Sequence, residues 1–143
     1  MSVQLDLLLM DADVQSWLST AGFKTVGTAD SLQEAIERAV NLPAAFTIYD
    51  GSKSAGRLTM GHKRQLRDPL SFSVAMVFQS LVSPGAVHQA AYPGIVAGER
   101  ALVGKTPATC LSPLRFVRDY FVSRMGPKVV YAAQFATKAE DFL

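Results

Sequence analysis

Residues 70 to 82 alternate large apolar and small side chains more regularly than any other part of the chain. The alternate positions hold Phe72, Val74, Met76 and Phe78 on one side and Ser71, Ser73, Ala75 and Val77 on the other. Because successive side chains of a strand point to opposite faces, this pattern predicts a strand with one buried face. The face of small residues has room for a helix or for a neighbouring subunit.

Helical and extended patterns lie on both sides of this strand. Apolar periodicity predicts helices over residues 4–21, with Leu8 and Leu9 on the apolar face, and over 86–103, where Pro93 is expected to kink or restart the helix. Ser31 and Glu34 have the spacing of a capping box, which predicts a short helix over 31–40. Short extended segments are expected at 23–26 and 44–49.

The pattern of the last third of the chain predicts a β-hairpin, and its composition offers few side chains suited to catalysis. Strands over 114–125 and 128–137 meet at Gly126, and their candidate core positions are Phe116, Phe121, Val130 and Phe135. Residues 101–135 are mostly apolar or basic, with one Asp, one Cys and no His. Such a composition favours packing and docking over catalysis, so assembly is the leading interpretation.

The remaining segments are predicted to be irregular. Residues 50–61, rich in Gly, Ser and Lys, predict a flexible loop, and Asp68-Pro69 predicts a turn before the strand. Residues 104–113 read as a linker and 138–143 as a flexible tail. A chain of 143 residues is near the common size of one domain, so we expect a single α+β domain over 1–143.

Composition argues against several classes of protein. One Cys and two His are too few for an internal disulfide or a usual zinc site, so we expect no metal and no cofactor. The first residues lack the basic region of a signal peptide, and no run of eighteen apolar residues occurs, so we expect neither export nor a membrane. Seven of the 12 acidic residues, but only two of the 14 basic residues, lie in 1–50. This asymmetry suits head-to-tail self-association, nucleic-acid binding or simply solvated faces.

Candidate catalytic motifs fail on spacing or context. The segment from Gly98 to Lys105 resembles a phosphate-binding loop, but five residues separate its glycines where the motif has four. Cys110 would need a base such as His62 or His88 nearby, and nothing in the sequence brings them together. Asp11 and Asp13 point to different sides of their helix. We therefore expect no catalytic residues, and an enzyme is the least favoured class.

One basic stretch stands out as a candidate interface. It holds five bases and no acid between residues 53 and 67, and with the neighbouring Met60 the candidate contact residues are Lys53, Arg57, Met60, Lys63, Arg64 and Arg67. No aromatic side chain lies among them, so the stacking platform of a single-strand binder is absent. The stretch is compatible with a protein-docking loop, with phosphate contact or with a solvated loop.

The order and spacing of several short segments resemble the small tail terminator proteins of Mu-like and related long-tailed bacteriophages. The resemblance covers roughly residues 30–136. Its elements are the helix ending Ala101-Leu102-Val103-Gly104, then Pro107, Ser112-Pro113-Leu114 leading into Phe116-Val117, Tyr120-Phe121-Val122, the turn at Gly126, and Val130-Tyr131 through Phe135, with Asp30 to Arg38 and Pro43-Ala44-Ala45-Phe46 upstream.

This resemblance implies a two-layer α+β subunit, with a mixed, mostly antiparallel sheet and two to three helices packed on one face. It implies a structural virion protein that forms a ring, expected to be hexameric, at the head-proximal end of the tail tube. Its partners would be other copies of the chain, the tube protein and a head–tail connector or neck protein, with passive contact to DNA in the lumen. Assembly would occur in the host cytoplasm.

Two alternatives remain at this point. The chain could be another neck or tail-completion adaptor, or a binding module with the same fold, or it could be a small nucleic-acid-binding protein that uses the basic stretch.

Overall fold

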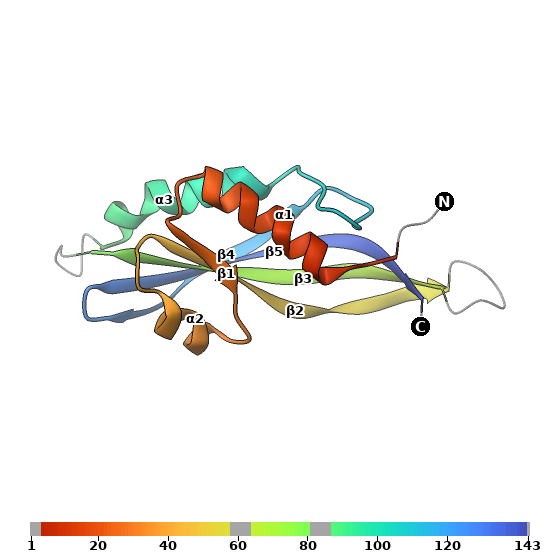
Figure 1. Ribbon diagram of the computed structural model, residues 1–143, viewed down its shortest axis with the longest axis horizontal. Helices are drawn as coiled ribbons and strands as arrows, with labels where there is room; N and C mark the ends of the chain where they lie inside the picture. Colours follow the sequence, from red (N-terminus) through yellow and green to blue (C-terminus); the bar gives the residue numbers. More distant parts are fainter. Residues whose placement is uncertain (1–3, 58–63, 81–86, 143) are drawn as a thin grey trace.

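A five-stranded sheet with helices on both faces makes up the residues that the computed structural model describes, 4–57, 64–80 and 87–142 (Figure 1). The elements in chain order are α1 (Leu7–Thr20), β1 (Thr25–Thr28), α2 (Leu32–Arg38), β2 (Ala44–Arg57), β3 (Arg64–Gln79), α3 (Val87–Leu102), β4 (Arg115–Met125) and β5 (Lys128–Phe142). The strand order is β1-β2-β3-β5-β4, and β1 and β2 form its one parallel pair. The expected α+β fold with a mixed, mostly antiparallel sheet is confirmed.

The central strand β3 is buried on both faces, as its alternation predicts. Phe72, Val74 and Met76 lie in one apolar cluster with residues of α1 and α3, whereas Ala75 and Val77 lie in a second cluster with residues of α2. Figure 1 shows α1 and α3 together on one side of the sheet and α2 on the other. Two helices therefore share a face, as expected, and the shortest helix covers part of the opposite face.

The helix α3 approaches the sheet closely through a glycine. A Cβ added at Gly98 would lie 3.1 Å from Sδ of Met76 and 3.2 Å from Cε2 of Phe23, tighter than ordinary contact. The helix runs unbroken from Val87 to Leu102 with Pro93 inside it, so the expected restart at Pro93 does not occur. The close approach brings the residues of α3 that follow Pro93 directly against the sheet.

The helix α1 begins later than its apolar pattern suggests. Asp6 caps the helix, and its carboxylate accepts a hydrogen bond from the backbone N–H of Leu8 at 2.9 Å. Leu8 is 81% exposed and Leu9 52% exposed, so the prediction that both are buried is wrong. The buried face instead consists of Met10, Val14 and Leu18, at a regular spacing of four.

The strands β2 and β3 extend well beyond the apolar segments that predict them. Residues 50–57, predicted as a loop, continue β2 opposite β3, with register shifts after Tyr49 and Ser52. The predicted turn at Asp68-Pro69 is also wrong, because β3 passes through this cis peptide bond with a register shift between Arg67 and Leu70. Proline has no N–H for the ladder, so the pairing is interrupted without ending the strand.

The chain's last described residues are part of the sheet. The prediction of a flexible tail at 138–143 is wrong for residues 138–142, which complete β5 and pair with β3 as far as Arg64 opposite Phe142. Ala139 is fully buried, and Asp141 forms an ion pair with Arg67. These contacts hold the C-terminal end of β5 in the sheet. Sequence periodicity alone did not indicate that the strand extends this far.

A charged side chain placed at Ala139 tests whether residues 138–142 are part of the folded sheet. Ala139→Asp is expected to lower the free energy of unfolding by about 3 kcal/mol, because a carboxylate would be buried without a partner. The same substitution at Ala55, an exposed position of β2, is the matched control and should change it by less than about 0.5 kcal/mol. Urea unfolding measures both variants, and equal effects would support a flexible tail after all.

Candidate docking surface and acidic pocket

The edge strand β4 exposes an unusual amount of apolar side chain. Phe116, Val117, Tyr120, Phe121 and Met125 are between 38% and 48% exposed. Of the four candidate core positions in the hairpin, Val130 and Phe135 are buried as predicted, but Phe116 and Phe121 are not. Each of these two rings packs edge-on against an aromatic ring of β5 and leaves its other side open.

The two edges of the sheet differ in how they are protected. β1 has only four residues, and the Arg38 guanidinium donates a hydrogen bond to the backbone carbonyl of Thr28 at that edge. β4 has eleven residues, of which the first seven in succession are exposed. A long apolar edge strand offers unpaired backbone groups and apolar surface to another chain. We call this surface, residues 115–125, the β4 edge.

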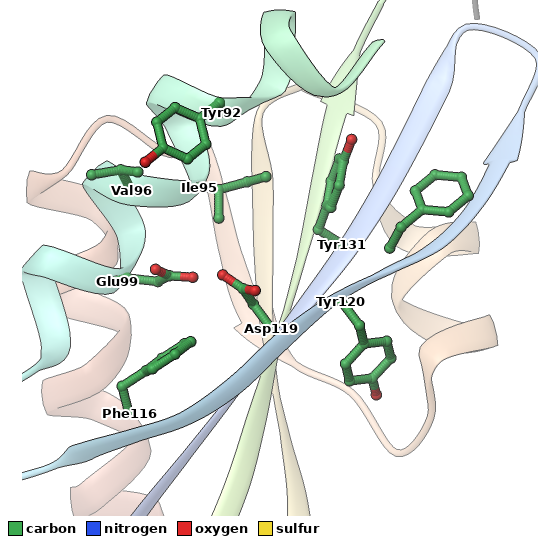
Figure 2. Close-up of a pocket in the computed structure, with 9 residues that line it drawn as sticks. Tyr92, Ile95, Val96, Glu99, Phe116, Asp119, Tyr120 and Tyr131 are labelled. Atoms are coloured by element: carbon green, nitrogen blue, oxygen red, sulfur yellow. The ribbon is translucent and has the colours of Figure 1, made fainter. Parts of the chain in front are cut away.

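A pocket of about 420 Å³ lies between α3 and β4. α3 contributes Tyr92, Ile95 and Val96 to its wall, β4 contributes Phe116 and Phe121, and β5 contributes Tyr131 (Figure 2). The wall is therefore mainly aromatic and aliphatic. Two acidic side chains, Glu99 of α3 and Asp119 of β4, also line the pocket, and with these residues it is called the acidic pocket below.

The two carboxyl groups of the acidic pocket point toward each other (Figure 2). They share a hydrogen bond, and Oε1 of Glu99 is buried with no other hydrogen-bond partner among the described residues. Burial, and then the hydrogen bond and the charge of Asp119, raise the pKa of Glu99 to about 8. At neutral pH the Glu99 carboxyl therefore retains its proton, which it can share with the Asp119 carboxylate.

The basic stretch includes one residue with a structural role and two at the paired ends of β2 and β3. Lys53 is exposed on β2, and Arg57 and Arg64 belong to the paired ends of β2 and β3. Arg67 is mostly buried; its guanidinium pairs with Asp141 and donates to Oγ of Ser52 at 3.1 Å, so it holds β3 to β5. Met60 and Lys63 lie outside the described residues.

Cys110 and the segment starting at Gly98 do not show the arrangement that their candidate motifs require. Burial and the nearby charge of Asp13 raise the pKa of Cys110 to about 11, so its thiol stays protonated at neutral pH. The side chain of His88 and the whole of His62 lie outside the described part. The segment starting at Gly98 is the end of α3 and the turn after it, so no helix N-terminus faces a phosphate there.

Within the described ranges, no group of three His, Cys, Asp or Glu side chains could hold a metal ion. In the same ranges no helix has the length and apolar character to cross a membrane.

Sequence reasoning missed the acidic pocket. Glu99 and Asp119 are twenty residues apart, on a helix and on a strand that sequence patterns do not place side by side. One signal was available, because Tyr92, Ile95, Val96 and Glu99 recur at spacings of three and four along one side of α3. That pattern indicates a shared face but not which strand it meets.

The fold and the β4 edge define a small α+β protein whose distinctive surface is suited to binding other proteins. The sequence model of the phage tail terminator proteins matches residues 4–140. The chain therefore belongs to the phage tail terminator family, as its segment order predicted, and is a structural protein of the phage tail.

A solved structure supports the same fold. A chain of the "Virion of native gene transfer agent (GTA) particle" is similar with a TM-score of 0.58 and 14% sequence identity, over 94% of this chain and 96% of that chain. No curated protein sequence matches this chain significantly.

The raised pKa of Glu99 predicts how stability depends on pH. The native carboxyl holds its proton up to about pH 8, whereas an unfolded one releases it near the ordinary value of 4.5. The free energy of unfolding therefore falls as pH rises through this window, because the native state binds more protons. Glu99→Gln should remove this loss and be more stable than the wild type by about 1 kcal/mol at pH 8 to 9, since the site is partly exposed.

Urea unfolding at about pH 5 and about pH 8.5 measures the difference. Glu37→Gln, at an exposed position of α2, is the matched control. Parallel pH profiles for the wild type and Glu99→Gln would show that the Glu99 carboxyl is not held protonated.

Proposed function

We propose that the chain forms a ring, with hexameric stoichiometry, that caps the head-proximal end of the phage tail tube. The ring ends tube polymerisation and provides the surface on which a head–tail connector or neck protein docks. Membership of the tail terminator family supports the role, and the exposed apolar β4 edge is the observation that carries the ring contact. The ring acts in the virion after assembly in the host cytoplasm.

The β4 edge favours a contact between copies. Burial of its apolar side chains stabilises association, and its unpaired backbone groups can continue the sheet into the next subunit. The acidic first third and the basic remainder of the chain favour a head-to-tail contact over a two-fold one, because unlike surfaces then meet. A head-to-tail contact whose rotation closes produces a ring.

Such a ring stops polymerisation of the tail tube without any chemical reaction. It covers the binding surface on the last ring of tube protein and does not present that surface again, so no further tube subunit can add. The partners are therefore other copies of this chain, the tube protein and the connector or neck protein. DNA passing through the lumen makes at most passive contacts, and no catalytic residue or cofactor takes part.

A charge on the β4 edge tests this function. Val117→Asp, at a 47% exposed position of β4, is expected to abolish rings, because it puts an unpaired carboxylate into the apolar contact. Leu111→Asp is the matched control, since Leu111 is 46% exposed but lies outside β4. Light scattering and negative-stain imaging, with and without tube protein, measure ring formation and tube length.

The wild type should form rings or cap tubes, and Leu111→Asp should do the same. Rings from Val117→Asp equal to those of the wild type would rule out the β4 edge. Wild-type chain that leaves tube length unchanged and binds at another place in the virion would instead indicate a neck or tail-completion adaptor.

A further inference from the structure

We propose that one side of α1 in each copy packs against the β4 edge of the next copy. This side of the helix holds four residues at spacings of three and four, and is called the α1 stripe: Leu8, Asp11, Ala12 and Gln15. The contact rests on the proposed ring and identifies the surface that the β4 edge meets. Leu8 is 81% exposed, more than any other large apolar side chain of the described residues, and a single chain does not explain this exposure.

The α1 stripe lies on the side of the molecule opposite the β4 edge. Nε2 of Gln15 donates a hydrogen bond to Oγ1 of Thr28 at 2.8 Å, and that hydroxyl donates to Oδ2 of Asp11 at 3.3 Å. Thr28 is the last residue of β1, and β1 and β4 are the two outer strands of the sheet. A closed head-to-tail ring needs two different contact surfaces on opposite sides of each subunit. The α1 stripe and the β4 edge have these positions.

The side of the molecule that carries α1 and β1 is acidic. Residues 1–37, which include both elements and most of α2, hold six acids and a single base, Lys24. Three of the acids belong to α1 and its cap, and α1 itself has no base. The electrostatic potential around Leu8 and Ala12 is therefore negative.

The β4 edge has the complementary charge, because Arg115 and Arg118 are exposed on it. Nε of Arg118 donates a hydrogen bond to Oε1 of Gln134 at 3.2 Å, and its guanidinium lies over the ring of Tyr120. Both partners are uncharged, so Arg118 keeps its positive charge at the edge. The one acid of β4, Asp119, points into the acidic pocket (Figure 2). A stripe therefore attracts an edge, whereas two stripes or two edges repel each other.

The strand β1 itself offers less to a neighbouring copy than the α1 stripe does. β1 has only four residues, and the Arg38 guanidinium already donates to the backbone carbonyl of Thr28. Leu8 and the methyl group of Ala12 are exposed and provide apolar surface on this side. This surface fits the exposed apolar side chains of the β4 edge, such as Val117.

Leu8→Lys tests the apolar part of the contact. It replaces the leucine by a cation that faces the arginines of the β4 edge, so subunit association should weaken about tenfold or more. Leu9→Lys is the matched control, because Leu9 lies in the same first turn but points about 100° away around the helix. It should assemble like the wild type. Light scattering coupled to size-exclusion chromatography, over a range of chain concentrations, measures the association.

Charges placed at Ala12 test which surface the α1 stripe meets. Ala12→Glu should strengthen association and Ala12→Lys should weaken it, each by about two- to fivefold. In a background that carries Arg115→Glu with Arg118→Glu the order should invert, because the β4 edge is then negative. Ala55→Glu and Ala55→Lys, at an exposed position of β2, are the matched controls and should show no such inversion.

Circular dichroism checks that every variant is folded. If Leu8→Lys is not, Leu8→Ser and Leu9→Ser take the place of the two lysine variants. If the double arginine background does not assemble, Arg118→Glu alone takes its place. If the wild type assembles only on tubes, the same samples are compared by tube length.

The outcomes separate the two proposals. Wild-type chain that neither forms rings nor caps tubes would overturn the ring and this contact with it. Wild-type rings together with equal assembly of Leu8→Lys and Leu9→Lys would overturn this contact and leave the ring intact. An order of the two Ala12 variants that does not invert between the backgrounds would have the same meaning.

Discussion

The large-and-small alternation of β3 is the constraint on which the rest of the structure depends. Its large side chains require a thick apolar layer, which α1 and α3 supply, and its small ones allow α2 to approach the opposite face. β3 also pairs along most of its length with both β2 and β5, so it fixes their registers. Phe72 stacked on Phe135, with ring centroids 5.7 Å apart, joins β3 to β5 inside the thicker layer.

This arrangement leaves β4 incompletely covered. β4 lies outside β5, where α3 covers only part of one face and no strand of the described chain pairs with its outer side. Phe116 and Phe121 reach β5 with their edges, and the remaining surface of each ring stays exposed. An isolated subunit therefore retains apolar area that an assembled one can bury, which agrees with its membership of a tail-protein family.

Local sequence patterns correctly predicted the helices and strands whose conformation is determined by their own residues. The β3 alternation, the hairpin around Gly126 and the helix before Gly104 were predicted, and the last two were also among the segments that carried the family resemblance. Residues 50–57 and 138–142 were missed, because polar or small residues form strands there only when β3 provides partners. Phe116 was misplaced for a related reason: alternation identifies a strand but does not tell whether a helix covers it.

The acidic pocket has an energetic consequence for the folded subunit. Glu99 keeps its proton in the folded chain, because burial and the neighbouring Asp119 carboxyl disfavour its ionised form relative to a carboxyl group in water. The subunit's own stability is therefore lowered, at neutral and higher pH, where α3 meets β4.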